Sequence, residues 1–223
     1  MIKKVEQGKK VSFPFEYLNR MQSTLASRNK ARTIEEFLDI DILDLALQAR
    51  ACNMIQSTMA DYNASDAPTK VKDNDLFYSA KNAMTNAHLK YLQFHLFWSA
   101  CKEKQMRDPR ILEVMELIGK IYCLDELLQD GAAVYDTGFF SPGSYRTMQK
   151  AMEQCVTKIR PQLLSLSETP YSPDHVLPSV IGNYYGDIYE QQLECAQKSR
   201  LNIDNEVPEY FESLMKPILR PKL

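Results

Sequence analysis

The chain has 223 residues, of which 44% are hydrophobic and 25% charged, with a formal net charge of −2 at pH 7. This composition excludes an intrinsically disordered chain, and cations interleaved with acids argue against a nucleic-acid-binding protein. No run reaches the roughly 18 apolar residues of a membrane span. The cysteines are odd in number and never form a C-x-x-C pair, so we expect neither disulfides nor a zinc site but buried thiols in a reducing compartment. They are Cys52, Cys101, Cys123, Cys155 and Cys195.

The first part of the chain predicts a lead-in segment followed by a long helix. Only seven glycines occur, and apolar residues recur in steps of three and four, which favours helices almost throughout. We expect residues 1–32 to lead into the bundle. Thr33 and Glu36 form a candidate capping box, and the helical spacing after them predicts one helix over residues 33–62.

A second long helix is predicted after a polar loop. Residues 63–72 contain Pro68 and several small polar residues, as is typical of a loop. The helix then starts near residue 73 or 75 and runs to about residue 104. It carries an aromatic run in steps of three and four, which indicates core or subunit interface rather than a cofactor site. The run consists of Tyr91, Phe94, Phe97 and Trp98.

Two pairs of a capping residue and a proline predict the next helices. Asp108 with Pro109 starts a third helix that ends at Gln129. Ser141 with Pro142 repeats the pattern and starts a fourth helix through Ile159, which Pro161 is expected to kink.

The last part predicts an irregular crossing with short helices. Three prolines lie between residues 167 and 178, and helices are expected near residues 188–197 and 208–219. The fold class is therefore all-α, an antiparallel bundle of about four long helices plus short C-terminal helices. We expect the bundle to occupy residues 33–166, with residues 167–223 packing on it as part of the same domain.

The residue types that commonly act in catalysis do not occur in a recognisable catalytic or metal-binding pattern. His88 and His95 lie seven residues apart on one helix face, but Thr85 and Leu92 stand where a di-iron bundle needs glutamate. We expect half-buried or interface histidines there and an exposed His175 in the crossing. Phosphate-binding, esterase and zinc-protease motifs are absent from the sequence.

Clustered acids near the first helix start could form a catalytic pair, but they spread over several faces and are expected to be solvated. These acids are Glu35, Glu36, Asp39, Asp41 and Asp44. From the residues alone we predict neither catalytic residues nor a metal site.

Several segments resemble the C-terminal part of peroxisomal acyl-CoA oxidases. GKKVSFPFEYLN (8–19) is similar to the linker that enters the last domain of that family. IRPQLLSL (159–166), IGNYYGDIYEQQLECAQKSRLN (181–202) and VPEYFESLMKPIL (207–219) follow in the family's order.

The central glycine motif has a structural explanation, since its glycines permit a tight backbone path and its tyrosines can bury their rings. Asn183 and Tyr185 depart from it, standing where the family commonly has Arg and Asp. The motif residues are Gly182, Tyr184, Gly186, Tyr189 and Glu190.

The resemblance implies FAD-dependent oxidation of acyl-CoA to trans-2-enoyl-CoA with formation of hydrogen peroxide, in fatty-acid β-oxidation. It places the catalytic glutamate and most flavin contacts upstream of this chain, so no catalytic or FAD-binding residue is assigned, and the isolated chain is expected to be inactive. It also implies packing on the catalytic domains and a homodimer-like second subunit. The alternative is a non-catalytic helical interaction protein derived from that family.

Packing of that kind would leave an apolar patch on the isolated chain. The residues expected to form the patch are Phe94, Phe97, Trp98, Phe139 and Phe140.

The last three residues, Pro221, Lys222 and Leu223, resemble the Ser-Lys-Leu peroxisomal signal, with Pro in place of Ser. We therefore expect recognition by the peroxisomal import receptor and a peroxisomal location. If the signal is inactive, the expected location is the cytoplasm.

Overall fold

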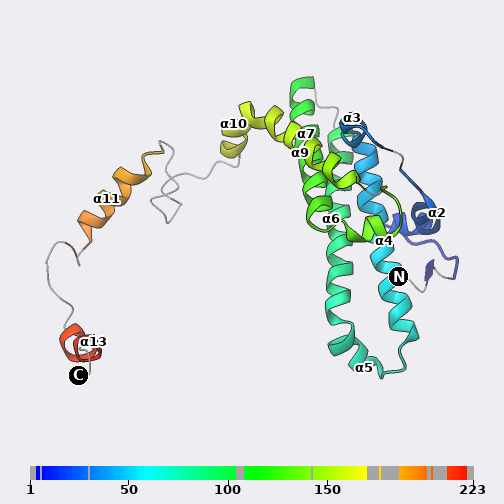
Figure 1. Cartoon of the computed structure of the whole chain (residues 1–223), viewed down its shortest axis with the longest axis horizontal. Coiled ribbons are helices and arrows are strands. Elements are labelled where there is room, and N and C mark those ends of the chain that lie inside the picture. The colour runs from blue at the N-terminus through cyan, green and yellow to red at the C-terminus, as the bar shows by residue number, and fades with distance from the viewer. Residues whose placement is uncertain are drawn as a thin grey trace. The chain divides into compact units, whose positions relative to one another are not determined.

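A computed structural model of the chain is all-helical over the residues that it describes, with no strand among them (Figure 1). The chain divides into two compact units, residues 1–163 and 164–223. The all-α prediction is confirmed. The structure describes residues 4–5, 7–29, 31–103, 108–141, 143–169, 176, 186–199, 202 and 210–219.

Four long helices dominate the described part of the first unit, with short helical segments before, between and after them. The long helices are α4 (Ile40–Ala64), α6 (Tyr78–Glu103), α7 (Pro109–Gln129) and α9 (Ser144–Ile159). The short segments are η1 (Glu16–Arg20), α2 (Met21–Ala26), α3 (Ile34–Phe37), α5 (Thr69–Val71), η2 (Lys72–Leu76), α8 (Ala132–Asp136) and η3 (Arg160–Gln162).

The first predicted long helix is in fact two helices. The capping box of Thr33 and Glu36 is confirmed, but α3 ends after one turn at Phe37. Asp39 then takes an extended conformation, and its side chain accepts a hydrogen bond from the Asp41 backbone N–H at 2.9 Å. Because an aspartate in this position caps a new helix, a continuous helix over residues 33–62 is wrong, although its periodicity continues through α4.

The start of α7 is confirmed, whereas the start of α9 lies further along the chain than predicted. Asp108 accepts from the Arg110 backbone N–H at 2.9 Å, and Pro109 occupies the first turn of α7. For α9 the residue before the helix is Gly143, with a left-handed φ of 89° that glycine adopts without strain. Ser141 therefore does not cap this helix, and Pro142 lies outside the described residues.

The core of the first unit lies between α4 and its neighbours. Helix α4 packs against α6 and α7, and α7 packs against α9 (Figure 1). Gly119 allows α7 to approach α6 closely, since a β-carbon there would lie 3.1 Å from the Phe94 ring. The largest side chains of the core include Phe37, Leu43, Leu47, Phe94, Leu124, Leu127, Phe139 and Met148.

The aromatic residues expected to form an exposed patch lie mostly in this core. Phe94, Trp98, Phe139 and Phe140 are all buried, so the predicted patch is wrong. Phe139 and Phe140 follow α8, and their ring centroids lie 4.9 Å apart. Phe140 also packs on Phe37 of α3 at 5.3 Å. This contact joins residues about 100 positions apart, which no local pattern reveals.

The segment expected only to lead into the bundle contributes to the core. Val11, Tyr17, Leu18 and Met21 are buried, and α2 packs against α4. Asn19 fixes the stretch around Val11, because its side chain accepts from the Val11 N–H and donates to the Val11 carbonyl, both at 2.9 Å. Residues 11–26 are thus an integral part of the first unit.

The second unit is described by itself. It contains most of α10 (Leu163–Glu168), α11 (Ile188–Lys198), η5 (Phe211–Met215) and α13 (Lys216–Leu219). Gly186 has a positive φ of 73° just before α11, whereas Tyr189 is 84% exposed. Gly182, Tyr184 and the final residues 221–223 lie outside the described residues. The predicted packing of residues 167–223 on the bundle stays a prediction.

Candidate functional site

His88 joins the N-terminal segment to α6. The residue is 8% exposed, and its Nδ1 lies 2.9 Å from the Tyr17 hydroxyl. The rings of Phe15 and Tyr17 stack on it at 4.8 and 5.6 Å. Burial lowers the pKa of His88 below its ordinary value of 6.5. A structural role was expected, but His88 is buried rather than half-buried or at an interface.

His95, two turns further along α6, has an acidic partner. Its Nδ1 lies 3.3 Å from an Asp44 carboxylate oxygen of α4, and its ring stacks on Tyr91 at 5.3 Å. The hydrogen bond to Asp44 raises the pKa of His95, and its side chain remains 46% exposed. The two histidines therefore have separate partners, and no group of three or more acidic, histidine or cysteine residues among the described residues could hold a metal ion.

The two histidines should show opposite pH dependence. Neutral His88 stabilises the fold fully above pH 6.5, and this contribution is lost as the pH falls towards its lowered folded pKa. The contribution of charged His95 is complete below pH 6.5 and is lost as the pH rises through its raised folded pKa. NMR titration of the ring carbons, assigned with His88→Gln and His95→Gln, measures both. Midpoints on the same side of 6.5 would contradict these contacts.

The predicted clustered acids do not form a catalytic pair. Glu36 belongs to the capping box, and its carboxylate accepts from the backbone N–H groups of Arg32 and Thr33, which lowers its pKa. Asp39 caps α4, while Asp41 lies 3.1 Å from the Lys102 ammonium. Glu36 and Asp39 thus cap helix starts, and Asp41 forms a surface ion pair.

Four of the five cysteines are buried, as predicted, and Cys195 is exposed in α11, where that prediction is wrong. Burial raises the pKa of Cys52 to about 12 and that of Cys123 well above its ordinary value. Since the thiolate is the nucleophile, these buried thiols are unreactive at neutral pH.

Sequence reasoning missed a charged cluster between α4, α6 and α7. Arg50 is 1% exposed and donates to the Glu126 carbonyl at 2.8 Å and to the Asp130 carbonyl at 3.3 Å, at the end of α7. Its guanidinium also lies 3.3 Å from the Glu126 carboxylate, which pairs with Lys90 at 2.5 Å. The available signal was an arginine within the apolar run of α4, between Ala49 and Ala51.

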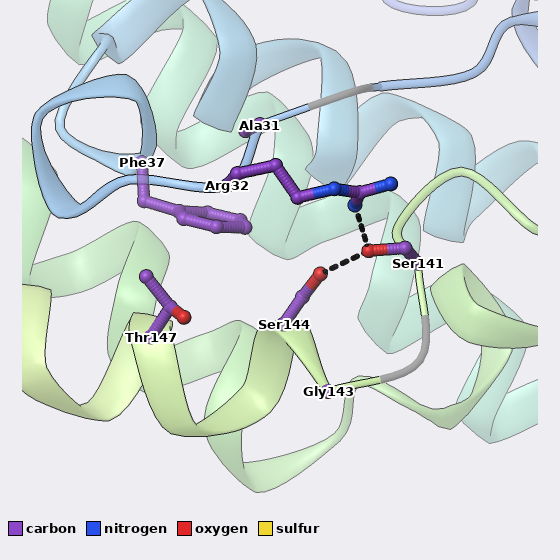
Figure 2. Close-up of a pocket in the computed structure, with 7 residues that line it drawn as sticks. All are labelled: Ala31, Arg32, Phe37, Ser141, Gly143, Ser144 and Thr147. Atoms are coloured by element: carbon purple, nitrogen blue, oxygen red, sulfur yellow. Dashed lines mark hydrogen bonds between the residues drawn. The ribbon is translucent and has the colours of Figure 1, made fainter.

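A polar hollow of about 430 Å³ lies where α9 begins (Figure 2). Arg32 donates to the Ser141 hydroxyl, which lies 3.0 Å from the Ser144 hydroxyl. Figure 2 shows these side chains converging from the α3 and α9 sides, with Phe37 beside them. The contacts join the segment before α3 to the start of α9, and the described residues that line the hollow include no acidic or histidine side chain.

A second, mostly apolar hollow of about 320 Å³ lies between α6 and α7. Phe97, Ile118 and Tyr122 form its walls, and Gly119 lies beside them. The Tyr122 hydroxyl donates to the Gln93 side-chain oxygen at 3.1 Å. Burial raises the pKa of Tyr122 to about 12, so it stays protonated and can only hydrogen-bond at neutral pH.

None of the described helices is long and apolar enough to cross a membrane.

Comparison with known families decides the relationship. A family model described as acyl-CoA oxidase matches residues 39–220, which is most of the chain. The chain belongs to the acyl-CoA oxidase family. The resemblance stated from the sequence is thereby confirmed.

The relatives are much longer acyl-CoA oxidases. Peroxisomal acyl-coenzyme A oxidase 1 of Phascolarctos cinereus is 26% identical over 219 residues, 96% of this chain and 33% of the relative. Its Arabidopsis thaliana counterpart is 23% identical over 93% of this chain and 31% of the relative. The chain thus spans about a third of the length of the curated oxidases that it matches.

Solved acyl-CoA oxidases share the fold. Arabidopsis thaliana acyl-CoA oxidase 1 matches 98% of this chain and 32% of its own with a TM-score of 0.82 and 21% identity. Acyl-CoA oxidase-2 of Caenorhabditis elegans, solved with FAD, ascaroside-CoA and ATP, matches all of this chain and 33% of its own with a TM-score of 0.76 and 18% identity.

Proposed function

We propose that this chain is the C-terminal helical domain of a peroxisomal acyl-CoA oxidase, lacking the catalytic base and most of the flavin site. The proposal rests on the family match over residues 39–220 and on the length of the chain, which spans about a third of the length of its relatives. The parent activity would be FAD-dependent oxidation of acyl-CoA to trans-2-enoyl-CoA with hydrogen peroxide formation. The Caenorhabditis elegans relative is bound with FAD, ascaroside-CoA and ATP.

The geometry of the first unit supports a structural role within such an enzyme. The Tyr17–His88, Asp44–His95 and Arg50–Glu126 contacts each join segments far apart in the sequence. Buried tyrosines and thiols have raised pKa values, which suits packing and hydrogen bonding rather than proton transfer at neutral pH.

The purified chain should bind no FAD and oxidise no acyl-CoA, because the base and most flavin contacts of the proposed parent lie outside it. The measurements are the visible absorbance of the protein after incubation with FAD, and peroxide formation from palmitoyl-CoA. A full-length acyl-CoA oxidase in the same assays is the control. Stoichiometric bound flavin, or peroxide above the protein-free rate, would overturn the proposal that the chain is chemically incomplete.

We also propose that the chain reaches peroxisomes through Pro221, Lys222 and Leu223 and the import receptor. The support is the Lys-Leu ending and the peroxisomal relatives. With an inactive signal the chain would remain in the cytoplasm.

Association with catalytic domains or a second subunit has support from exposed apolar side chains on α6 and on α7. Leu89 and Leu96 are 48% and 44% exposed and lie two turns apart on one side of α6. On α7, Ile111 is 51% exposed and lies two turns before Ile118, which lines the hollow. These α6–α7 side chains, Leu89, Leu96, Ile111 and Ile118, also support the alternative of a non-catalytic helical interaction protein.

The isolated chain should self-associate at micromolar concentration, because exposed apolar side chains such as these favour burial against another surface. Leu96→Lys places a charge among these α6–α7 side chains and should shift the population towards the monomer. Val156→Lys, at a 48% exposed position on α9, is the matched control and should leave the association unchanged. Light scattering with sedimentation measures the mass. A monodisperse wild-type monomer of 25.7 kDa would contradict the expectation.

A further inference from the structure

We draw no further inference here: the strongest candidate, the set of exposed apolar side chains on α6 and α7 together with the hollow lined by Phe97, Ile118 and Tyr122, already serves the association proposed above, and nothing in the structure shows what covers it.

Discussion

Replacing Arg50 by methionine is expected to lower the free energy of unfolding by about 1–3 kcal/mol, the usual cost of leaving a buried hydrogen-bonding group without its partner, since Glu126 keeps its ion pair with Lys90. Methionine keeps much of the side-chain length, so the loss comes mainly from the guanidinium contacts. These contacts reach the Glu126 carboxylate and the carbonyls of Glu126 and Asp130. Substitution therefore weakens the attachment of the end of α7 to α4.

Urea unfolding followed by fluorescence measures this effect, since the chain has one tryptophan, Trp98, which is buried in the first unit. Lys102→Met is the matched control, because Lys102 is 52% exposed and its ion pair with Asp41 is worth at most about 1 kcal/mol. Equal losses in the two variants would show that Arg50 is not held in a buried pair.

A double-mutant cycle separates the ion pair from the packing of the Arg50 side chain. Arg50→Met combined with Glu126→Leu should cost at least about 1 kcal/mol less than the sum of the single changes, since both charges are then removed together. Lys90 loses its partner in the double variant, but its side chain is 32% exposed and can reach solvent. Strict additivity would mean that Arg50 and Glu126 are not coupled.

Local signals in the sequence were sufficient for the helix starts that depend on neighbouring residues. Asp108 with Pro109 begins α7 because both the cap and the fixed φ of proline act within one turn. The break before α4 was missed because Asp39 competes with an uninterrupted apolar periodicity. The side-chain cap of Asp39 begins a new helix there, and the apolar periodicity alone does not reveal this break.

At the candidate site, the contacts between residues far apart in the chain could not be predicted from the sequence. His88 could be assigned to a helix face, but its partner Tyr17 lies 71 residues away on a segment expected to lead into the bundle. Phe139 and Phe140 were expected to contribute to an exposed patch, because the family resemblance implied that catalytic domains cover the bundle. Nothing nearby in the sequence shows that Phe37 of α3 packs on Phe140 and that both rings are buried. The family resemblance identified the relationship without locating these contacts.

Tyr17→Ala tests whether the N-terminal segment is part of the core. Tyr17 is 7% exposed, packs on Tyr91 at 4.7 Å and bonds to His88 at 2.9 Å. Removing a buried aromatic ring leaves a cavity, so we expect a loss of about 3–5 kcal/mol in the free energy of unfolding. Tyr17→Phe keeps the ring but leaves His88 Nδ1 without this partner, so a smaller loss of about 1–3 kcal/mol is expected.

Phe13→Ala is the matched control, since Phe13 belongs to the same segment and is 61% exposed. Its effect should stay within about 0.5 kcal/mol, as for other surface substitutions. The order Tyr17→Ala, Tyr17→Phe, Phe13→Ala, from largest to smallest loss in the same urea titration, is what a docked segment requires. If Tyr17→Ala is as mild as Phe13→Ala, residues 11–26 contribute little to the stability of the bundle, and the segment acts as the lead-in that the sequence predicts.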